Sequence, residues 1–296
     1  MQLLVPCLVA SVIPMVLARP WRRQASEPTY FFTFGNSYTQ TGFSTTGEQP
    51  SASNPMGNPA LGTGTTTGGL NWVGYLTTEQ NSSLVLSYNL AIGGATIDDS
   101  LVASTQGDLV SQVESFEQVY SSKSESAPWT AENAVFGFWI GVNDIGNAFY
   151  NTDADTFVPQ LVDRLESLVQ QIISAGGRKF LFLNVPPTGR SPFFIAQGEE
   201  TMEQHAAYLD VYNQQIESLV TGLSANGTEV TAVLYDSWSF MTDVLDNPGK
   251  YGYQDATCIN EDGVTCAWWN DYHPSARYHQ LQAEDMKAVL APLGAW

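Results

Sequence analysis

The sequence predicts an α/β protein with helices on both faces of a five-stranded, mainly parallel sheet. Short apolar runs of strand-like composition alternate with longer stretches whose apolar residues recur at helical spacing. The connections are long enough for helical crossovers between parallel strands. The expected architecture is therefore a three-layer α/β/α sandwich, formed as one domain over residues 24–296.

The expected strands are apolar and rich in aromatic or β-branched residues, as strands buried on both faces of a parallel sheet are. They span residues 30–34, 83–89, 134–140, 179–185 and 229–235. Gly35 ends the first strand and Pro186-Pro187 ends the fourth, so these boundaries are the firmest.

The expected helices span residues 70–79, 108–119, 155–175, 201–224 and 275–291. The third has the clearest apolar stripe, and Gly176-Gly177 ends it. Between the first strand and the first helix, residues 42–69 are rich in Gly, Ser, Thr, Pro and Asn and show no periodicity. A loop of this length often serves function, so we expect it to form part of a cleft wall.

The composition indicates which partners the protein can have and where it is located. Eleven basic residues stand against thirty acidic ones, and the net charge of −19 disfavours nucleic acid or an anionic membrane as a partner. The apolar residues 1–18 are typical of a signal peptide, and the basic residues after them suggest a short pro-segment over 19–23. We expect a secreted monomer.

In a secreted protein, cysteines can form disulfides and asparagines in sequons can be glycosylated. Cys7 would leave with the signal peptide, and we expect a disulfide between Cys258 and Cys266. Asn81 and Asn226 begin the sequons NSS and NGT, and both lie in turn-like segments. We expect both to be glycosylation sites.

Ser37 and His273 are the candidate nucleophile and general base. Ser37 follows the first strand directly, and the carboxyl ends of parallel strands are where α/β proteins bind ligands. We expect Ser37 to open a helix, which would leave its backbone N–H free. His273 is fixed by Pro274, whereas His205 and His279 fall within expected helices.

Four segments stand in order along the chain: TFGNSYT at 33–39, NLAIGGAT at 89–96, GVND at 141–144 and WWNDYHP at 268–274. With their flanking text they resemble the GDSL, or SGNH, hydrolases, and look most like the fungal secreted acetylesterases of carbohydrate esterase family sixteen. The resemblance spans nearly all of the chain after residue 29. It implies flavodoxin-like strand order and catalysis without a metal or organic cofactor.

The resemblance also implies three donors to the oxyanion that forms during acyl transfer. They are the backbone N–H groups of Ser37 and Gly94 and the side-chain amide of Asn143. Gly93 is an alternative to Gly94. Asn36 replaces the aspartate that the family usually carries before its serine, which removes a charge and keeps an acceptor.

The group that orients His273 is left open between two neighbours. The family spacing Asp-x-x-His falls on Asn270, whereas the carboxylate stands at Asp271. We favour Asp271 because a carboxylate stabilises an imidazolium, and keep Asn270 as the alternative. Asp255 or Asp262 are further candidates. Trp268 or Trp269 is expected to contact a sugar.

The residues by themselves support ester hydrolysis, and the resemblance implies acetyl esters of small hemicellulose-derived saccharides as substrates. A lipid esterase or lysophospholipase of the same fold is one alternative. A catalytically inactive carbohydrate-binding relative is another, since asparagine stands at both position 36 and position 270.

Overall fold

Five parallel strands form the centre of the protein in the order β2-β1-β3-β4-β5. The computed structural model describes residues 27–225 and 229–296. The signal peptide expected over 1–18, the pro-segment over 19–23, Cys7 and Asn226 lie outside the described residues. The strand order is the flavodoxin-like one, as expected.

Each strand begins and ends within a few residues of the expected positions. The strands are β1 (Thr29–Gly35), β2 (Val85–Asn89), β3 (Ala134–Trp139), β4 (Lys179–Leu183) and β5 (Thr231–Tyr235). Their side chains are nearly all buried in β1 to β4, because helices cover both faces of the sheet.

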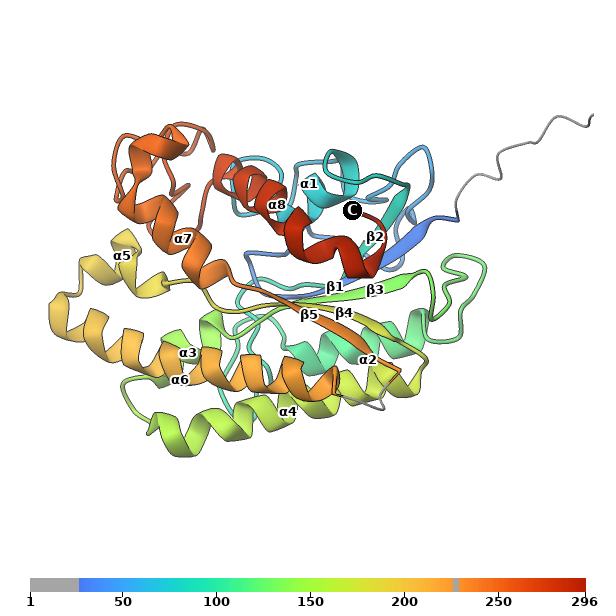
Figure 1. Ribbon diagram of the computed structural model, residues 1–296, viewed down its shortest axis with the longest axis horizontal. Coiled ribbons are helices and arrows are strands. Elements are labelled where there is room, and N and C mark those ends of the chain that lie inside the picture. The colour runs from blue at the N-terminus through green and yellow to red at the C-terminus, as the bar shows by residue number, and fades with distance from the viewer. Residues whose placement is uncertain (1–26, 226–228) are drawn as a thin grey trace, which may run out of the picture.

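Five expected helices are present, and three short ones were not anticipated. The helices are α1 (Trp72–Thr78), α2 (Leu109–Val119), α3 (Val142–Ala148), α4 (Ala154–Ser174), α5 (Pro192–Ile195), α6 (Glu199–Leu223), α7 (Ser237–Asp246) and α8 (Ala276–Leu290). Figure 1 shows α2, α4 and α6 on one face of the sheet and α1 and α8 on the other.

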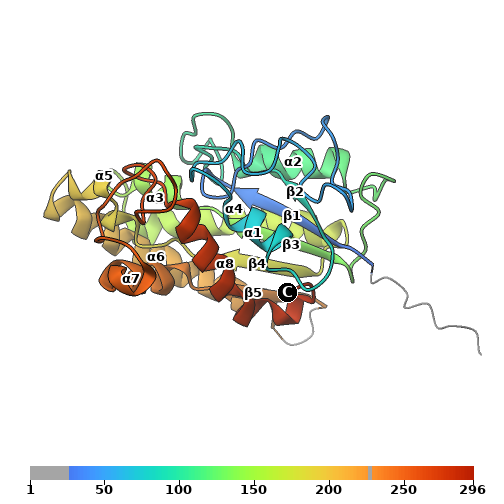
Figure 2. The same cartoon turned by 90° about the horizontal axis from the view of Figure 1, so that it is seen from above.

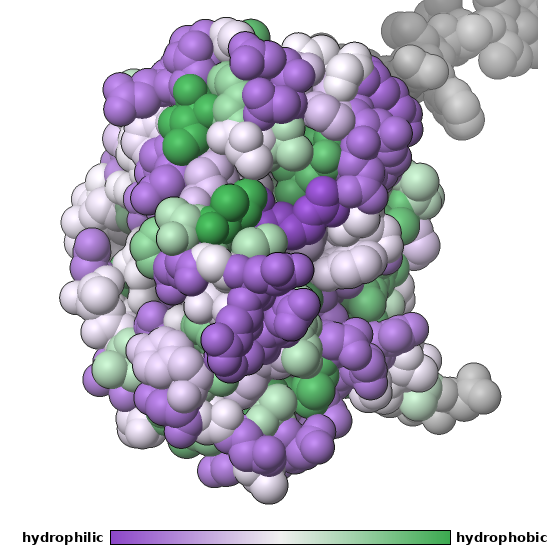
Figure 3. All heavy atoms as spheres, turned by 90° about the vertical axis from the view of Figure 1, so that its left-hand side faces the viewer, coloured by the Kyte–Doolittle hydropathy of each residue, from purple (hydrophilic) through white to green (hydrophobic). Residues whose placement is uncertain are grey.

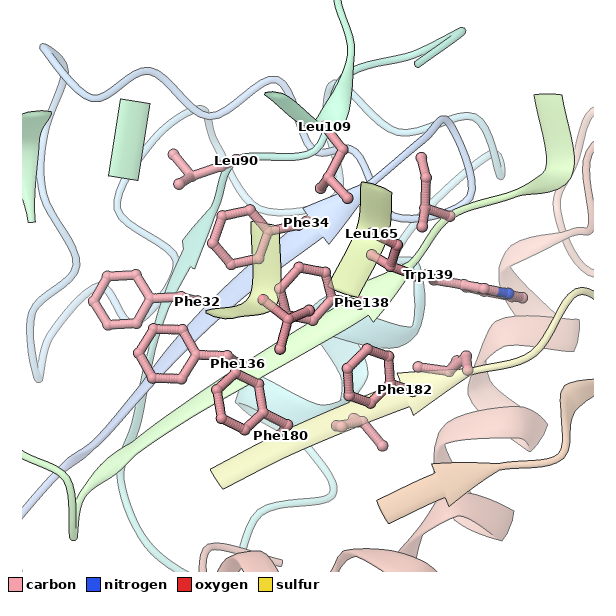
Figure 4. Close-up of a cluster of buried hydrophobic side chains, with 14 of the residues drawn as sticks. Phe32, Phe34, Leu90, Leu109, Phe136, Phe138, Trp139, Leu165, Phe180 and Phe182 are labelled. Carbon is pink, nitrogen blue, oxygen red and sulfur yellow. The ribbon is translucent and has the colours of Figure 1, made fainter. Parts of the chain in front are cut away.

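An aromatic ladder fills the face of the sheet that α2 and α4 cover (Figure 4). Phe32 pairs in register with Phe136, and Phe34 with Phe138, with ring centroids 5.3 and 4.9 Å apart. Phe182 extends the ladder onto β4, 5.3 Å from Phe138. The stacked rings bury a large apolar area, and that burial fixes the strand whose end carries Ser37.

All five strands point the same way, so their carboxyl ends meet at one edge of the sheet (Figure 2). The loop after β1, the short helices α3 and α5, and the loop before α8 gather there. Figure 3 views the molecule from this edge and shows small apolar patches among hydrophilic residues.

Cys258 and Cys266 form the expected disulfide. Asn81 lies in the turn between α1 and β2, where its side chain donates to the carbonyl oxygen of Ser83. Glycosylation of Asn81 stays a prediction. Within residues 27–225 and 229–296, no helix is both long and apolar enough to cross a bilayer.

Candidate functional site

The loop that carries Ser37, here called the serine loop, begins where β1 ends, at Gly35. Gly35 has a φ of 148°, and a Cβ there would lie 2.3 Å from the carbonyl oxygen of Trp139, so only glycine fits. Asn36 then makes a turn, in which its Oδ1 accepts from the N–H of Tyr38 and its carbonyl oxygen accepts from Thr39 and Gln40.

Ser37 lies in this turn and does not open a helix, contrary to the expectation. A helix would need the next carbonyl oxygens to accept from later N–H groups of the same segment. Instead, the carbonyl oxygen of Thr39 accepts from the side-chain amides of Asn71 and Asn89, and that of Gln40 also accepts from Asn71. The backbone therefore runs on as a loop.

Gln112 fixes the start of this loop from α2. Its Oε1 accepts from the N–H of Gly35 and its Nε2 donates to the carbonyl oxygen of Gly35, both at 2.8 Å. Sequence reasoning missed this contact. The available signal was a glutamine within the apolar stripe of α2, beside Leu109, Val113 and Phe116.

The loop from Trp268 to Pro274, here called the histidine loop, is closed by its own backbone. Trp268 and Pro274 form an antiparallel bridge, and the N–H of Trp269 donates to the carbonyl oxygen of His273 at 2.8 Å. The hydroxyl of Tyr38 donates to the carbonyl oxygen of Tyr272, which joins this loop to the serine loop.

Ser37 and His273 meet despite lying 236 residues apart in the sequence. Serine Oγ and imidazole Nε2 are 2.8 Å apart, within the range for proton transfer between them. Burial lowers the pKa of His273 to about 4, against a smaller opposing effect of the Asp271 carboxylate. The imidazole is therefore neutral at pH 7 and able to accept the serine proton.

Asn270, and not Asp271, contacts the other ring nitrogen of His273. Asn270 Oδ1 lies 3.0 Å from His273 Nδ1 and also accepts from the backbone N–H groups of Tyr272 and His273. These donors aim the amide oxygen at the ring, so the preference for Asp271 is not what the geometry shows. The side chain of Asp271 is exposed.

Neither of the two further carboxylates makes a hydrogen bond to the ring. Asp255 accepts from Thr257 and Cys258, and Asp262 accepts from Val264 and Thr265. Each is occupied by a turn of its own. The histidine is thus oriented by a neutral amide.

The three expected oxyanion donors are arranged around the end of β1 and its neighbours. Among the described residues, the N–H groups of Ser37, Gly93 and Gly94 have no hydrogen-bond partner, so the choice between the two glycines stays open. The Nδ2 of Asn143 donates to the carbonyl oxygen of Ala95 at 2.8 Å. Its second N–H is left for a ligand.

Asp144, the residue after Asn143, is completely buried and supports the same region. Its Oδ1 accepts from the N–H of Ile97 at 2.9 Å, and its Oδ2 has no partner among the described residues. Burial raises the pKa of Asp144 to about 7, with the Ile97 N–H opposing the rise. Together Asn143 and Asp144 hold residues 95–97 against α3.

A cavity of about 450 Å³ lies between α3, α5 and the histidine loop. Asn143, Asp271 and Tyr272 line it together with exposed aromatic side chains. Trp268 is only 1% exposed and donates to the carbonyl oxygen of Ala256, so the expectation that it contacts a sugar is wrong. For the half-buried Trp269 that contact stays a prediction.

The long loop over residues 42–69 touches the serine loop. Thr66 Oγ1 donates to the carbonyl oxygen of Ser37, and Gln40 Nε2 donates to that of Gly64. In the part of the chain that the structure describes, no group of three or more His, Cys, Asp or Glu side chains is placed to hold a metal ion.

Comparison with known proteins adds sequence relatives. Residues 31–286 match the family described as GDSL-like lipase/acylhydrolase. An acetylesterase of Thermothelomyces thermophilus is 42% identical over 271 residues, covering 90% of this chain and 90% of that protein. An acetylesterase of Hypocrea jecorina is 24% identical over 298 residues, covering 83% of this chain and 84% of that protein.

Solved structures share the fold at low sequence identity. A protein of Parabacteroides merdae described as a GDSL-like lipase aligns with a TM-score of 0.51 at 14% identity, covering 88% of this chain and 94% of that one. A mutant of an acetyl-xylooligosaccharide esterase from Geobacillus aligns with a TM-score of 0.50 at 13% identity, covering 90% and 94%.

Proposed function

This chain belongs to the GDSL-like lipase/acylhydrolase family, and from that premise we propose that it is a secreted acetylesterase acting on small acetylated saccharides. Family membership makes the protein a carboxylic ester hydrolase. The preference for acetyl groups is supported by the names of the two fungal relatives. Secretion is supported by the disulfide between Cys258 and Cys266 and by the apolar residues 1–18.

The observation that carries the proposal is the 2.8 Å contact between Ser37 Oγ and His273 Nε2. In the first step Ser37 Oγ attacks the carbonyl carbon of the acetyl ester while Nε2 takes the hydroxyl proton. The oxyanion that develops accepts from the N–H of Ser37, the N–H of Gly94 and the side-chain amide of Asn143. Each donor of this kind lowers the barrier by about 3 kcal/mol.

The tetrahedral intermediate then breaks down. His273 returns the proton to the oxygen of the leaving alcohol, and the acetyl group stays on Ser37. Water repeats the sequence with His273 as base and releases acetate. Asn270 accepts a hydrogen bond from the Nδ1–H of the ring, which keeps Nε2 unprotonated in the resting state and directed at the serine.

Among the alternatives, an inactive carbohydrate-binding relative is disfavoured because the Ser37 and His273 contact is intact. A lipid esterase has one observation in its favour, the exposed apolar side chains of Phe193 and Ile195 on α5. It would need to hold an acyl chain, whereas an acetylesterase needs room for a methyl group only.

A chain-length series of p-nitrophenyl esters tests the proposal. We expect kcat/KM to be highest for the acetate and to fall steadily through butyrate and octanoate. Higher kcat/KM for octanoate than for acetate would contradict an acetylesterase and favour the lipid esterase. Acetylated xylo-oligosaccharides should release acetate with the same enzyme, and the Ser37→Ala variant should release none above background.

A further inference from the structure

The cavity between α3, α5 and the histidine loop contributes only Asn143 to the acyl transfer described above. It adjoins the reacting groups, because Asp271 and Tyr272 directly precede His273 and because Asn143 lines it. Its volume of about 450 Å³ is ample for a monosaccharide unit.

The direction of proton transfer decides which half of the substrate lies there. His273 Nε2 must deliver a proton to the oxygen of the leaving alcohol, so that oxygen lies on the histidine side of Ser37. The acyl carbonyl oxygen faces the three oxyanion donors, which are the N–H groups of Ser37 and Gly94 and the side-chain amide of Asn143 at the cavity wall. The alcohol part of the ester therefore extends toward Asp271 and Tyr272.

The cavity wall combines aromatic faces with an unpaired amide. Tyr150 is 66% exposed and Phe193 is 46% exposed, large values for aromatic side chains. The ring of Phe193 is held 5.6 Å from that of Tyr272, and the N–H of Phe193 donates to the carbonyl oxygen of Asp271. The C–H faces of a pyranose pack against such rings.

Asn147 gives the cavity a polar group close enough to Asn143 to contact the sugar of a bound ester. It follows Asn143 by four residues on α3, so the two side chains lie on the same face of the helix, about 6 Å apart. In the described part of the chain the Asn147 side chain has no hydrogen-bond partner of its own. A sugar attached to an ester at Asn143 would place its hydroxyls within reach of Asn147.

The charge of the cavity wall favours neutral sugars over anionic ones. Among the residues that the structure describes, Asp271 is the only charged one that lines the cavity, and no lysine or arginine lines it. The Asp271 side chain is exposed and accepts no hydrogen bond from the described residues. An anionic sugar in the cavity would meet this carboxylate without any compensating cation.

We propose that this cavity binds the sugar ring that carries the acetyl group, and that Asp271 restricts the enzyme to neutral sugars by repelling uronates. The inference rests on the proposed function and extends it by naming the accepted class of alcohol. For charges about 6 Å apart in partly screened solvent, the repulsion corresponds to roughly tenfold in kcat/KM.

A matched pair of substrates tests whether Asp271 repels uronates. Acetylated methyl glucoside and acetylated methyl glucuronoside differ only in a hydroxymethyl or carboxylate group at one carbon. At low salt we expect wild-type kcat/KM to favour the glucoside by roughly tenfold, and about 0.5 M salt to reduce that ratio. Asp271→Asn should bring the ratio to about twofold by improving the glucuronoside alone.

Glu261→Gln is the control, since it removes the same charge from an exposed residue that does not line the cavity. It should leave the ratio at the wild-type value. An Asp271→Asn ratio equal to that of wild type, or an equal change in Glu261→Gln, would overturn the assignment of Asp271.

Tyr150→Ala tests the sugar site itself, and its exposed side chain makes the variant safe for folding. We expect KM for the glucoside ester to rise about fivefold with kcat nearly unchanged, as for the loss of one stacking contact. Ethyl acetate, whose alcohol cannot reach the cavity wall, should show no change. An equal change in both substrates, or none in either, would refute the cavity as the sugar site.

The two proposals fail in different ways. Sugar acetates hydrolysed no faster than ethyl acetate by the wild-type enzyme would refute the proposed function. A glucoside ester hydrolysed well by wild type, with Asp271→Asn and Tyr150→Ala kinetically identical to it, would refute only the cavity assignment.

Discussion

The serine loop and the histidine loop contribute one residue each to the same hydrogen bond, and they are held in different ways. Ser37 is 8% exposed, and side-chain amides from three other elements, Gln112, Asn71 and Asn89, bind the backbone on either side of it. The histidine loop has its own backbone bridge, the nearby disulfide and one asparagine, and its contacts from other elements are to the carbonyl oxygens of Asp271 and Tyr272 on one side of His273.

This difference has a consequence for stability and for catalysis. The serine loop is anchored in the sheet and in helices that form the main core, so disturbing it should weaken the whole fold. The histidine loop packs on a smaller apolar cluster around Met241, Val244 and Tyr278, so disturbing it should affect the base more than the fold.

The largest effect is expected from His273→Ala. Without the base, Ser37 stays protonated, and kcat for p-nitrophenyl acetate should fall by about 10³-fold or more. The melting temperature should change little, because the loop is closed by backbone contacts. Asp271→Ala on the same loop is the control and should keep kcat within about threefold; a loss as large as that of His273→Ala would restore Asp271 as the orienting group.

Next in size is Gln112→Leu, directed at the serine loop. It removes both hydrogen bonds to Gly35 and leaves the buried N–H of Gly35 unpaired. The free energy of unfolding should fall by about 2 to 3 kcal/mol, and kcat should fall about tenfold or more as the serine shifts. Urea unfolding and steady-state kinetics measure the two effects.

The matched control for that variant is Gln118→Leu, the same change on the exposed face of α2. Its stability should stay within about 0.5 kcal/mol of wild type. Equal stability and equal kcat in the two variants would mean that the hydrogen bonds between Gln112 and Gly35 contribute nothing.

A smaller effect is expected from Cys258→Ser with Cys266→Ser. The disulfide closes a loop between two cysteines that are eight residues apart. Its removal should lower the free energy of unfolding by about 2.5 kcal/mol. We also expect kcat to fall about threefold to tenfold, because Cys266 lies two residues before the histidine loop. Lower stability with unchanged kcat would show that the disulfide supports the fold without positioning the base.

The smallest effect, and the most specific, is expected from Asn270→Asp. In wild type the pKa of His273 is lowered to about 4 by burial, so kcat/KM should stay constant from pH 7 to about pH 5 and halve near pH 4. A carboxylate at position 270 stabilises the imidazolium and raises that pKa. The acid limb of the pH profile should then move up by about one unit or more.

Asn270→Ala completes that test. It removes the acceptor that Tyr272, His273 and the ring share, so kcat should fall at every pH. An unchanged acid limb in Asn270→Asp would contradict the assignment of Asn270 as the group that orients the histidine.

The sheet and the main helices could be predicted from the sequence because long apolar runs leave few alternatives. The three helices α3, α5 and α7, of seven, four and ten residues, could not. Residues 142–148 contain Gly146 and only two turns, and their helical form depends on packing against α6. The same holds for α5, whose four residues follow Ser191 as the N-cap.

Within the site, Ser37 and His273 could be identified from local motifs, whereas their supports depend on contacts between distant segments. Gln112 lies 77 residues from Gly35, and no local pattern links the two. The choice between Asn270 and Asp271 depends on which side chain two backbone N–H groups capture, and one residue of register reverses it.

Labelling with a fluorophosphonate, followed by mass mapping of the modified peptide, tests most directly whether Ser37 is activated by His273. We expect rapid modification of Ser37 in the wild-type enzyme, none in Ser37→Ala, and labelling slowed by about 10³-fold in His273→Ala. Modification at another residue, or equal rates in wild type and His273→Ala, would contradict it.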